Sequence, residues 1–481
     1  MLFNSFEFLL YLPIFFTLYW ILNKYTNKSI TNILILLGSY LFYGWWDYRF
    51  LFLIILSSII DFIVGISIEK TEKKTKKKLL LALSLTANLG MLMYFKYVNF
   101  FIDNFVEMMQ TMGIQANVSS LQIILPVGIS FYTFQTLSYS IDVYRGNLKA
   151  SRNFVSFFAY VSFFPQLVAG PIERATNLLP QFSKPKNFNY DTARNGMQQI
   201  LWGLFKKVVV ADNCAHIVND IFANYESVSS GTLILGAVLF AFQIYGDFSG
   251  YSDIAIGSAR LLGFNLNKNF AYPYFSRDIA EFWRRWHISL STWFRDYLYI
   301  PLGGSKGSKW KKVRNTFIIF LVSGFWHGAN WTFVIWGALN ALYFLPLLLK
   351  EKNRRNLDTV SMDRLIPKFK EIVQIIFTFF LTTLAWIFFR AESVEKAIVY
   401  IKRIILNNSY FPKIEPIYLT TIFIPIALLI FFEWMFRTRE FGLELDKSSN
   451  KIIRYATYSL VLVCVVFLGS FESDSFIYFQ F

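Results

Sequence analysis

Long apolar stretches, separated by short basic loops, are the feature that most restricts how this chain can fold. A transmembrane helix needs about 20 mostly apolar residues. Candidate spans lie at roughly 7–22, 30–46, 50–68, 79–101, 121–143, 197–217, 231–246, 315–329, 331–349, 372–390, 417–435 and 452–471. Only 16% of the 481 residues are charged, whereas a soluble domain has about a quarter. We therefore predict an all-α, polytopic membrane protein with about 10–12 transmembrane helices.

Two further apolar stretches, 153–168 and 247–264, contain or adjoin residues that interrupt helices. These are Pro165, Gly170, Gly250 and Gly257. Irregular backbone at membrane depth is tolerated only inside protein or against a cavity. We expect both stretches to be broken, re-entrant segments that line a site.

The net charge of +16 comes from Lys and Arg in the short loops. Basic loops cluster at 70–78, 306–314, 350–370 and 437–454, whereas 102–120 and 218–230 contain no Lys or Arg. Basic loops that alternate with loops lacking Lys and Arg are typical of a membrane protein whose basic loops lie in the cytoplasm. The positive charge therefore needs no nucleic-acid partner to explain it. The alternation places both termini outside, although the basic loop 391–416 does not fit the pattern.

No stretch is long enough to form a soluble domain with its own core, so we expect one membrane domain over residues 1–481. The first residues, MLFNSFEFLLYLP, lack a basic region and a cleavage site, and we expect a retained first helix. The chain has two cysteines, Cys214 and Cys464, in apolar surroundings. They support neither a disulfide framework nor a zinc site, and we predict no metal.

His327 lies within an uncharged stretch between Asn315 and Lys350. The stretch must turn near Gly328, which places His327 and Asn330 at or near membrane depth. An ionisable residue there is a functional hypothesis by default, and a neutral imidazole is a common general base near pH 7. The alternative is a structural histidine bonded to a neighbouring carbonyl.

His287 lies in RDIAEFWRRWHISLSTWFRDYLYIPLGG. Helical spacing puts aromatic residues such as Trp286 on one face and Arg284, His287 and Arg295 on the other. This predicts an amphipathic helix, lying on the cytoplasmic interface or bordering a cavity that receives an anionic donor. We expect a structural role for the third histidine, His216.

Asp247 and Asp253 lie among small residues. Paired acids there suit a proton path or a metal site. The alternative is that they cap helices and form hydrogen bonds within a broken segment. No histidine lies at metal-ligand spacing nearby, so a metal is disfavoured. Our candidate substrate-channel residues are Asp247, Tyr251, Asp253, Trp283, Arg284, Arg285, Trp326 and Asn330.

At these residues the sequence resembles the membrane-bound O-acyltransferase family, in the bacterial branch that includes the membrane subunit of alginate O-acetylation. The matching stretches are MLFNSFEFLLYLP, FFPQLVAGPIERATNLLPQF at 163–182, YGDFSGYSDIAIGSARLLGFNLNKNFAYPYFSRDIAEFWRRWHISLSTWFRDYLYIPLGG at 245–304 and FWHGANWTFVIWGALN at 325–340. The resemblance covers essentially the whole chain, with a core motif region at 163–345.

The resemblance implies helices around a central tunnel or funnel in a bacterial cytoplasmic membrane. It implies His327 as the principal catalytic histidine and His287 as the second. It also implies a thioester acyl donor, expected to be acetyl-CoA, with no bound cofactor. An acetyltransferase outside the membrane would be the partner, and a polysaccharide the final acceptor.

The chain ends in SFIYFQF, within a predicted extracytoplasmic tail at 472–481. Phe476, Tyr478 and Phe481 resemble an F-x-Y-x-x-F ending on small membrane partners of D-alanylation machinery. That resemblance implies Tyr478 as a transient acyl acceptor. The alternative is an aromatic tail resting at the interface.

Three other functions remain open at this point. One is a D-alanyl or other acyl transferase that uses a carrier protein. The second is a transporter or flippase, which predicts a charge network joining Asp61, Asp247 and Asp253. The third is a non-catalytic membrane platform that recruits an external transferase, for which His327 and Tyr478 are both dispensable.

Overall fold

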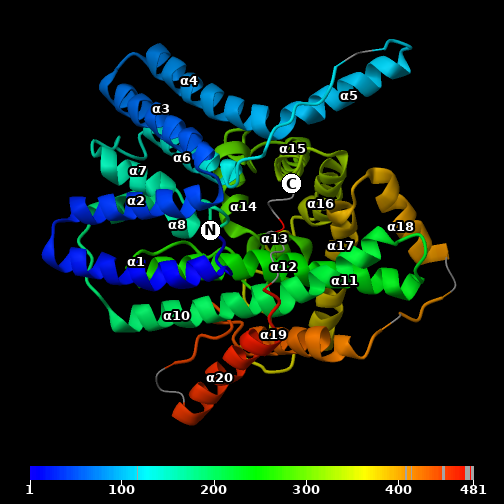
Figure 1. Cartoon of the computed structure of the whole chain (residues 1–481). Coiled ribbons are helices and arrows are strands. Elements are labelled where there is room, and N and C mark those ends of the chain that lie inside the picture. Colours follow the sequence, from blue (N-terminus) through cyan, green and yellow to red (C-terminus); the bar gives the residue numbers. More distant parts are fainter. Residues whose placement is uncertain (116–117, 407–408, 413, 447–449, 472–476, 478–481) are drawn as a thin grey trace. The chain divides into compact units, whose positions relative to one another are not determined.

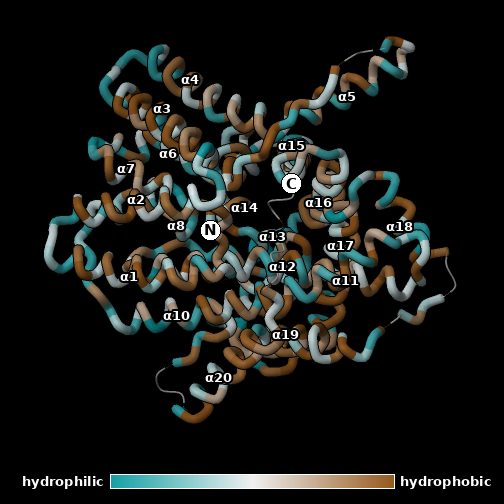
Figure 2. The backbone as a smooth tube through the Cα atoms, viewed as in Figure 1, coloured by the Kyte–Doolittle hydropathy of each residue, from teal (hydrophilic) through white to brown (hydrophobic). Residues whose placement is uncertain are grey.

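The computed structural model describes residues 1–115, 118–406, 409–412, 414–446, 450–471 and 477, and within these ranges the chain forms helices and loops without strands (Figure 1). In this part of the chain, 7 helical stretches are long and apolar enough to cross a membrane. They are Phe6–Tyr25, Lys28–Lys70, Lys74–Thr111, Ser230–Leu261, Trp331–Leu349, Phe369–Arg390 and Lys451–Leu468. Hydrophobic residues make up long parts of these helices (Figure 2). The predicted all-α, polytopic membrane fold is confirmed.

The helices form two compact units, one of residues 1–193 and 259–266 and the other of 194–258 and 267–481. The single domain over 1–481 stays a prediction. The first unit contains α1 (Phe6–Tyr25), α2 (Lys28–Asp47), α3 (Leu51–Lys70), α4 (Lys74–Leu92), α5 (Val98–Thr111), α6 (Ile129–Arg145), α7 (Phe154–Ser162), α8 (Phe164–Leu167) and α9 (Ala175–Ser183). The second contains most of α10 (Tyr190–Leu204) and α12 (Ser230–Leu261), and all of α11 (Asp212–Ala223), α13 (Ile279–Arg285), α14 (Ile288–Phe294), α15 (Lys309–His327), α16 (Trp331–Leu349), α17 (Phe369–Arg390), α18 (Val394–Leu406), α19 (Ile424–Met435) and α20 (Lys451–Leu468).

In the first unit, a buried carboxylate links three helices. Asp61 on α3 is fully buried and accepts hydrogen bonds from Ser84 and Asn88 on α4 and from Ser140 on α6. Polar side chains of this kind join helices where the bilayer offers no other partners. Asp61 thus has a local structural role that requires no transport pathway.

In the second unit, α12 packs closely against α10 and the π-helix η3 (Phe205–Ala211), which continues α10. A Cβ added at Gly250 would lie 2.7 Å from the backbone oxygen of Gly203, and one added at Gly257 would lie 2.5 Å from that of Gly196. These glycines therefore permit a close helix–helix approach. Our prediction that 247–264 is broken is wrong, because α12 runs without interruption to Leu261.

The predicted break at 153–168 is confirmed, since α7 ends at Ser162 and α8 begins at Phe164. The predicted continuous amphipathic helix around His287 is wrong. The helix stops at Arg285 and a second one starts at Ile288. His287 has φ 44° and ψ 55°, a left-handed conformation that cannot continue a right-handed helix.

Candidate active site

His327 is the last residue of α15, where that helix turns back into α16. The two helices pack tightly because glycines lie at their crossing. A Cβ added to Gly324 would overlap the backbone oxygen of Phe333, and a Cβ added to Gly337 would overlap the backbone oxygen of Phe320. Asn330 caps α16 by accepting a hydrogen bond from the Thr332 backbone N–H at 3.0 Å. The tight hairpin thus fixes the backbone that carries His327.

His287 is held in its bend by Asn269, a residue that sequence reasoning missed. The backbone N–H of Ile288 donates to the Asn269 carbonyl at 2.9 Å. The Asn269 side-chain oxygen lies 3.1 Å from His287 Nδ1 and accepts from the Ser289 hydroxyl at 2.8 Å. Its amide nitrogen donates to the Ser252 hydroxyl on α12 at 3.0 Å. Nothing in the sequence marks Asn269, because it acts through a strained bend that periodicity does not predict.

These contacts fix the tautomer of His287. The Ser289 backbone N–H, which can only donate, points at the same Asn269 oxygen at 3.3 Å, so that oxygen is an acceptor. His287 Nδ1 must therefore carry the proton, which leaves a lone pair on Nε2. His287 lies outside the candidate membrane spans, and its burial lowers its pKa to about 3. The imidazole is thus neutral across the physiological pH range.

The two histidines, separated by 40 positions in sequence, lie together in the fold. Their ring centroids are 6.5 Å apart, and their exposed fractions are 1% for His287 and 2% for His327. Aromatic rings surround the pair. Phe248 lies edge-on to His287 at 4.6 Å, and Trp336 lies edge-on to His327 at 5.1 Å. We call this arrangement the histidine chamber; its further walls are Trp326, Phe270 and Phe389.

The arginines predicted to attract a donor are engaged with protein groups instead. Arg284 donates to the backbone oxygens of Asn353 and Asn356, at 2.8 and 2.6 Å. Arg285 pairs with Glu281 at 2.8 Å and also donates to two backbone oxygens. Our prediction of one helix face carrying Arg284, His287 and Arg295 is therefore wrong. The arginines hold a neighbouring loop, while His287 lies buried at the helix break.

The remaining predicted channel residues are found in several places. Trp326 is in the histidine chamber, and Trp283 donates to the Asn340 side chain at 3.2 Å. Tyr251 is buried on α12. Tyr478 lies outside the described residues. His216 lies on α11, with its Nε2 3.3 Å from the Ser470 hydroxyl.

Asp247 and Asp253, six residues apart on α12, each pair with a different lysine. Asp253 contacts Lys206 Nζ at 2.5 Å, and Asp247 contacts Lys207 Nζ at 2.8 Å. The predicted charge network of a transporter joins these acids to one another and to Asp61. Each of the three instead has its own local partners. In the part of the chain that the structure describes, no group of three or more His, Cys, Asp or Glu side chains is placed to hold a metal.

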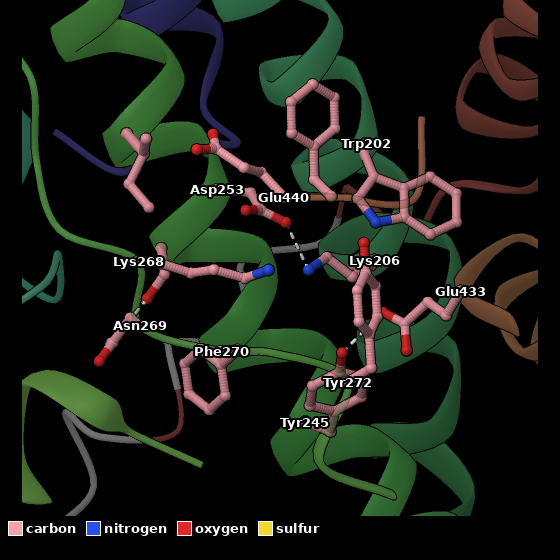
Figure 3. A pocket seen from close by; sticks show the side chains of 13 residues that line it. Trp202, Lys206, Tyr245, Asp253, Lys268, Asn269, Phe270, Tyr272, Glu433 and Glu440 are labelled. Atoms are coloured by element: carbon pink, nitrogen blue, oxygen red, sulfur yellow. Dashed lines mark hydrogen bonds and ion pairs between the residues drawn. The ribbon is translucent and has the colours of Figure 1, made fainter. Parts of the chain in front are cut away.

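Sequence reasoning also missed a charged pocket beside Asn269. Figure 3 shows Lys206 and Lys268 extending toward one another, with Asp253 alongside. Glu433 accepts a hydrogen bond from the Tyr245 hydroxyl at 2.6 Å, and Glu440 also lines the pocket. The residues come from η3, α12, α19 and the loops that follow α12 and α19, so no local sequence pattern reveals them.

Comparison with known proteins identifies the family. The model of the membrane-bound O-acyltransferase family matches residues 148–391, which include both chamber histidines. A probable alginate O-acetylase AlgI of Pseudomonas aeruginosa is 40% identical over 82% of this chain and 73% of its own length. A peptidoglycan O-acetyltransferase of Helicobacter pylori is 37% identical over 85% of this chain and 80% of its own length. A teichoic acid D-alanyltransferase of Bacillus subtilis is 29% identical over 45% of this chain and 57% of its own length. The chain is therefore an acyltransferase enzyme and belongs to the membrane-bound O-acyltransferase family.

Proposed function

We propose that this enzyme takes an acetyl group from a cytoplasmic thioester, acetyl-CoA, and transfers it across the membrane for O-acetylation of an extracellular polysaccharide. The observation that carries the proposal is the buried pair of histidines in an aromatic chamber. Acyl transfer from a thioester needs a base for the attacking hydroxyl and a site that excludes water. The O-acetylating relatives, which align over more than four-fifths of the chain, favour acetyl over D-alanyl as the group transferred.

In this proposal His327 is the general base. Its imidazole removes the proton from the acceptor hydroxyl, and the oxygen attacks the thioester carbonyl. The carbon–sulfur bond then breaks, and the imidazolium returns the proton to the departing thiolate. His287 Nε2 carries a lone pair and no proton, so it accepts a hydrogen bond from a substrate and positions that substrate. Stabilising an oxyanion instead would require a proton on Nε2, which the bond between Nδ1 and Asn269 disfavours.

The loop at 305–308, together with the start of α15 up to residue 314, is the proposed attraction point for the phosphates of the donor. Lys306, Lys309 and Lys311 are exposed there, whereas Arg284 and Arg285 are engaged with protein groups. Exposed lysines suit phosphate as mobile point charges. The proposal places this loop on the cytoplasmic side of the bacterial cytoplasmic membrane.

The donor is tested with purified enzyme in lipid vesicles. We expect radiolabel from acetyl-CoA to reach protein or an added acceptor, and D-alanine on a carrier protein to give no transfer. Transfer from the D-alanyl carrier alone would replace the acetyl proposal with the D-alanyl one. Movement of an unreacted substrate across the vesicle, without acyl exchange, would instead support a transporter.

Tyr478 is the proposed first acceptor, from which an acetyltransferase partner outside the membrane collects the group. We expect the intact mass of the enzyme, trapped with donor and without partner, to rise by one acetyl group on the C-terminal peptide. The matched Tyr478→Phe variant, which keeps the ring and removes only the hydroxyl, should show no such adduct. Normal polymer acetylation by that variant would refute the role of Tyr478 and leave that of His327 intact.

A further inference from the structure

A buried lysine on the π-helix η3 joins two carboxylates in the second unit. Lys207 Nζ lies 2.7 Å from Asp212 Oδ1 and 2.8 Å from Asp247 Oδ1. The three residues are only 2–3% exposed. Two carboxylates and one ammonium leave an excess negative charge, and such a charge is costly to bury unless further hydrogen bonds compensate it.

A hydrogen bond from the C-terminal tail meets this need. The backbone N–H of Ile477 donates to Asp247 Oδ2 at 2.7 Å, and Ile477 itself is 3% exposed. A bond from a backbone N–H to a carboxylate is among the strong hydrogen bonds in proteins. Asp247 thus uses one oxygen for Lys207 and the other for the tail.

The residues just before the tail are attached to the same part of the fold. Ser470 donates its backbone N–H to the Val208 oxygen at 2.9 Å, and the Asn213 side chain donates to the Leu468 oxygen at 2.8 Å. Val208 lies on the π-helix. π-Helical turns often occur at functional sites. Here the turn supplies both a backbone acceptor for residue 470 and the lysine that holds Asp247.

The attachment at residue 477 lies beside the histidine chamber along α12. Asp247 immediately precedes Phe248, whose ring packs edge-on against His287 at 4.6 Å. Ile477 immediately precedes Tyr478 in the sequence. The contact therefore connects a residue next to the chamber wall with the residue before the proposed acyl acceptor.

We propose that Asp247 is a positioning residue that clamps the C-terminal tail by its backbone amide at Ile477, so that the tail is held for acyl transfer. Lys207, which also pairs with Asp212, orients the Asp247 carboxylate. Because the clamp binds a backbone N–H, it can hold residue 477 whatever side chain that residue carries. The use of the clamp in acyl transfer rests on the proposed function, whereas the clamp itself rests only on these contacts.

Hydrogen–deuterium exchange of the full-length enzyme tests the clamp directly. In the wild type we expect the Ile477 amide to be protected, and in Asp247→Ala to exchange about 10- to 100-fold faster, as a charge-assisted bond is lost. Asp247→Asn keeps an acceptor oxygen and should fall between the two. The matched control is Asp253→Asn, which removes the other lysine-paired carboxylate of α12 and should leave exchange at Ile477 unchanged. Equal exchange in the wild type and Asp247→Ala would overturn the clamp.

Two substitutions at residue 477 test whether the backbone N–H matters for transfer. Ile477→Pro removes the donor, whereas Ile477→Val keeps both the donor and an apolar side chain. We expect the proline variant, like Asp247→Ala, to form much less acyl-tail adduct at an unchanged KM for the donor, and the valine variant to match the wild type. Equal adduct formation by both residue-477 variants would overturn the positioning role. A fully active His327→Ala would remove the proposed mechanism without altering the exchange result, so the two failures can be told apart.

Discussion

Replacing His327 with alanine is expected to lower the rate of acyl transfer by about 10²- to 10⁴-fold, the range that a general base contributes. The ring lies at the end of α15, 2% exposed, with its centroid 6.5 Å from that of His287. The imidazole packs against Trp336 of α16, but the close approach of the two hairpin helices depends on glycines and backbone atoms, so the fold should persist. Initial rates in lipid vesicles, normalised to inserted enzyme, measure the effect.

The matched control is His216→Ala. His216 lies on α11 and contacts the Ser470 hydroxyl, and this variant should keep the wild-type rate. His327→Gln should be as inactive as His327→Ala, because glutamine keeps polarity and approximate size but cannot act as a base near neutral pH. Full activity of either His327 variant, with normal insertion, would contradict the proposed mechanism and favour the non-catalytic platform.

The fold class was predictable from sequence because the bilayer imposes a strong rule on composition. Apolar stretches of sufficient length must become helices, since backbone polar groups have no partners in lipid. Glycines account for our wrong prediction of a broken segment at 247–264. In the sequence Gly250 and Gly257 predict helix breaks, but in the structure they lie on the face of α12 that contacts α10. A single sequence does not tell whether a helical glycine marks a break or a close contact.

The two histidines could be singled out because so few ionisable residues lie in apolar surroundings, and the resemblance supplied their roles. Their geometry was not predictable. His287 adopts a left-handed conformation, whereas an argument from helical periodicity assumes a continuous right-handed helix. Its partner Asn269 is fixed by tertiary contacts with Ser289 and Ser252. For the same reason helical periodicity predicts Arg284 on the same face as His287, whereas the break gives the two side chains different surroundings.

The second large effect is expected at Gly324, one turn before His327 on α15. A Cβ at this position would overlap the backbone oxygen of Phe333 on α16, and a backbone atom cannot move aside as a flexible side chain can. We expect Gly324→Ala to destabilise the enzyme by about 1–3 kcal/mol, as overpacking does. The accompanying shift of His327 by even about 1 Å should lower activity by about 10²-fold.

The control for this substitution is Gly90→Ala on α4, where an added Cβ meets no atom within 4 Å. Alanine favours a helix over glycine by roughly 0.5–1 kcal/mol, so Gly90→Ala should be neutral or slightly stabilising. Thermal unfolding followed by size-exclusion chromatography, together with transfer rates, distinguishes the two glycines. If Gly324→Ala behaved like Gly90→Ala in both measurements, the hairpin would not be the close-packed support of His327, and the position of the base would have to be fixed by the aromatic rings of the chamber alone.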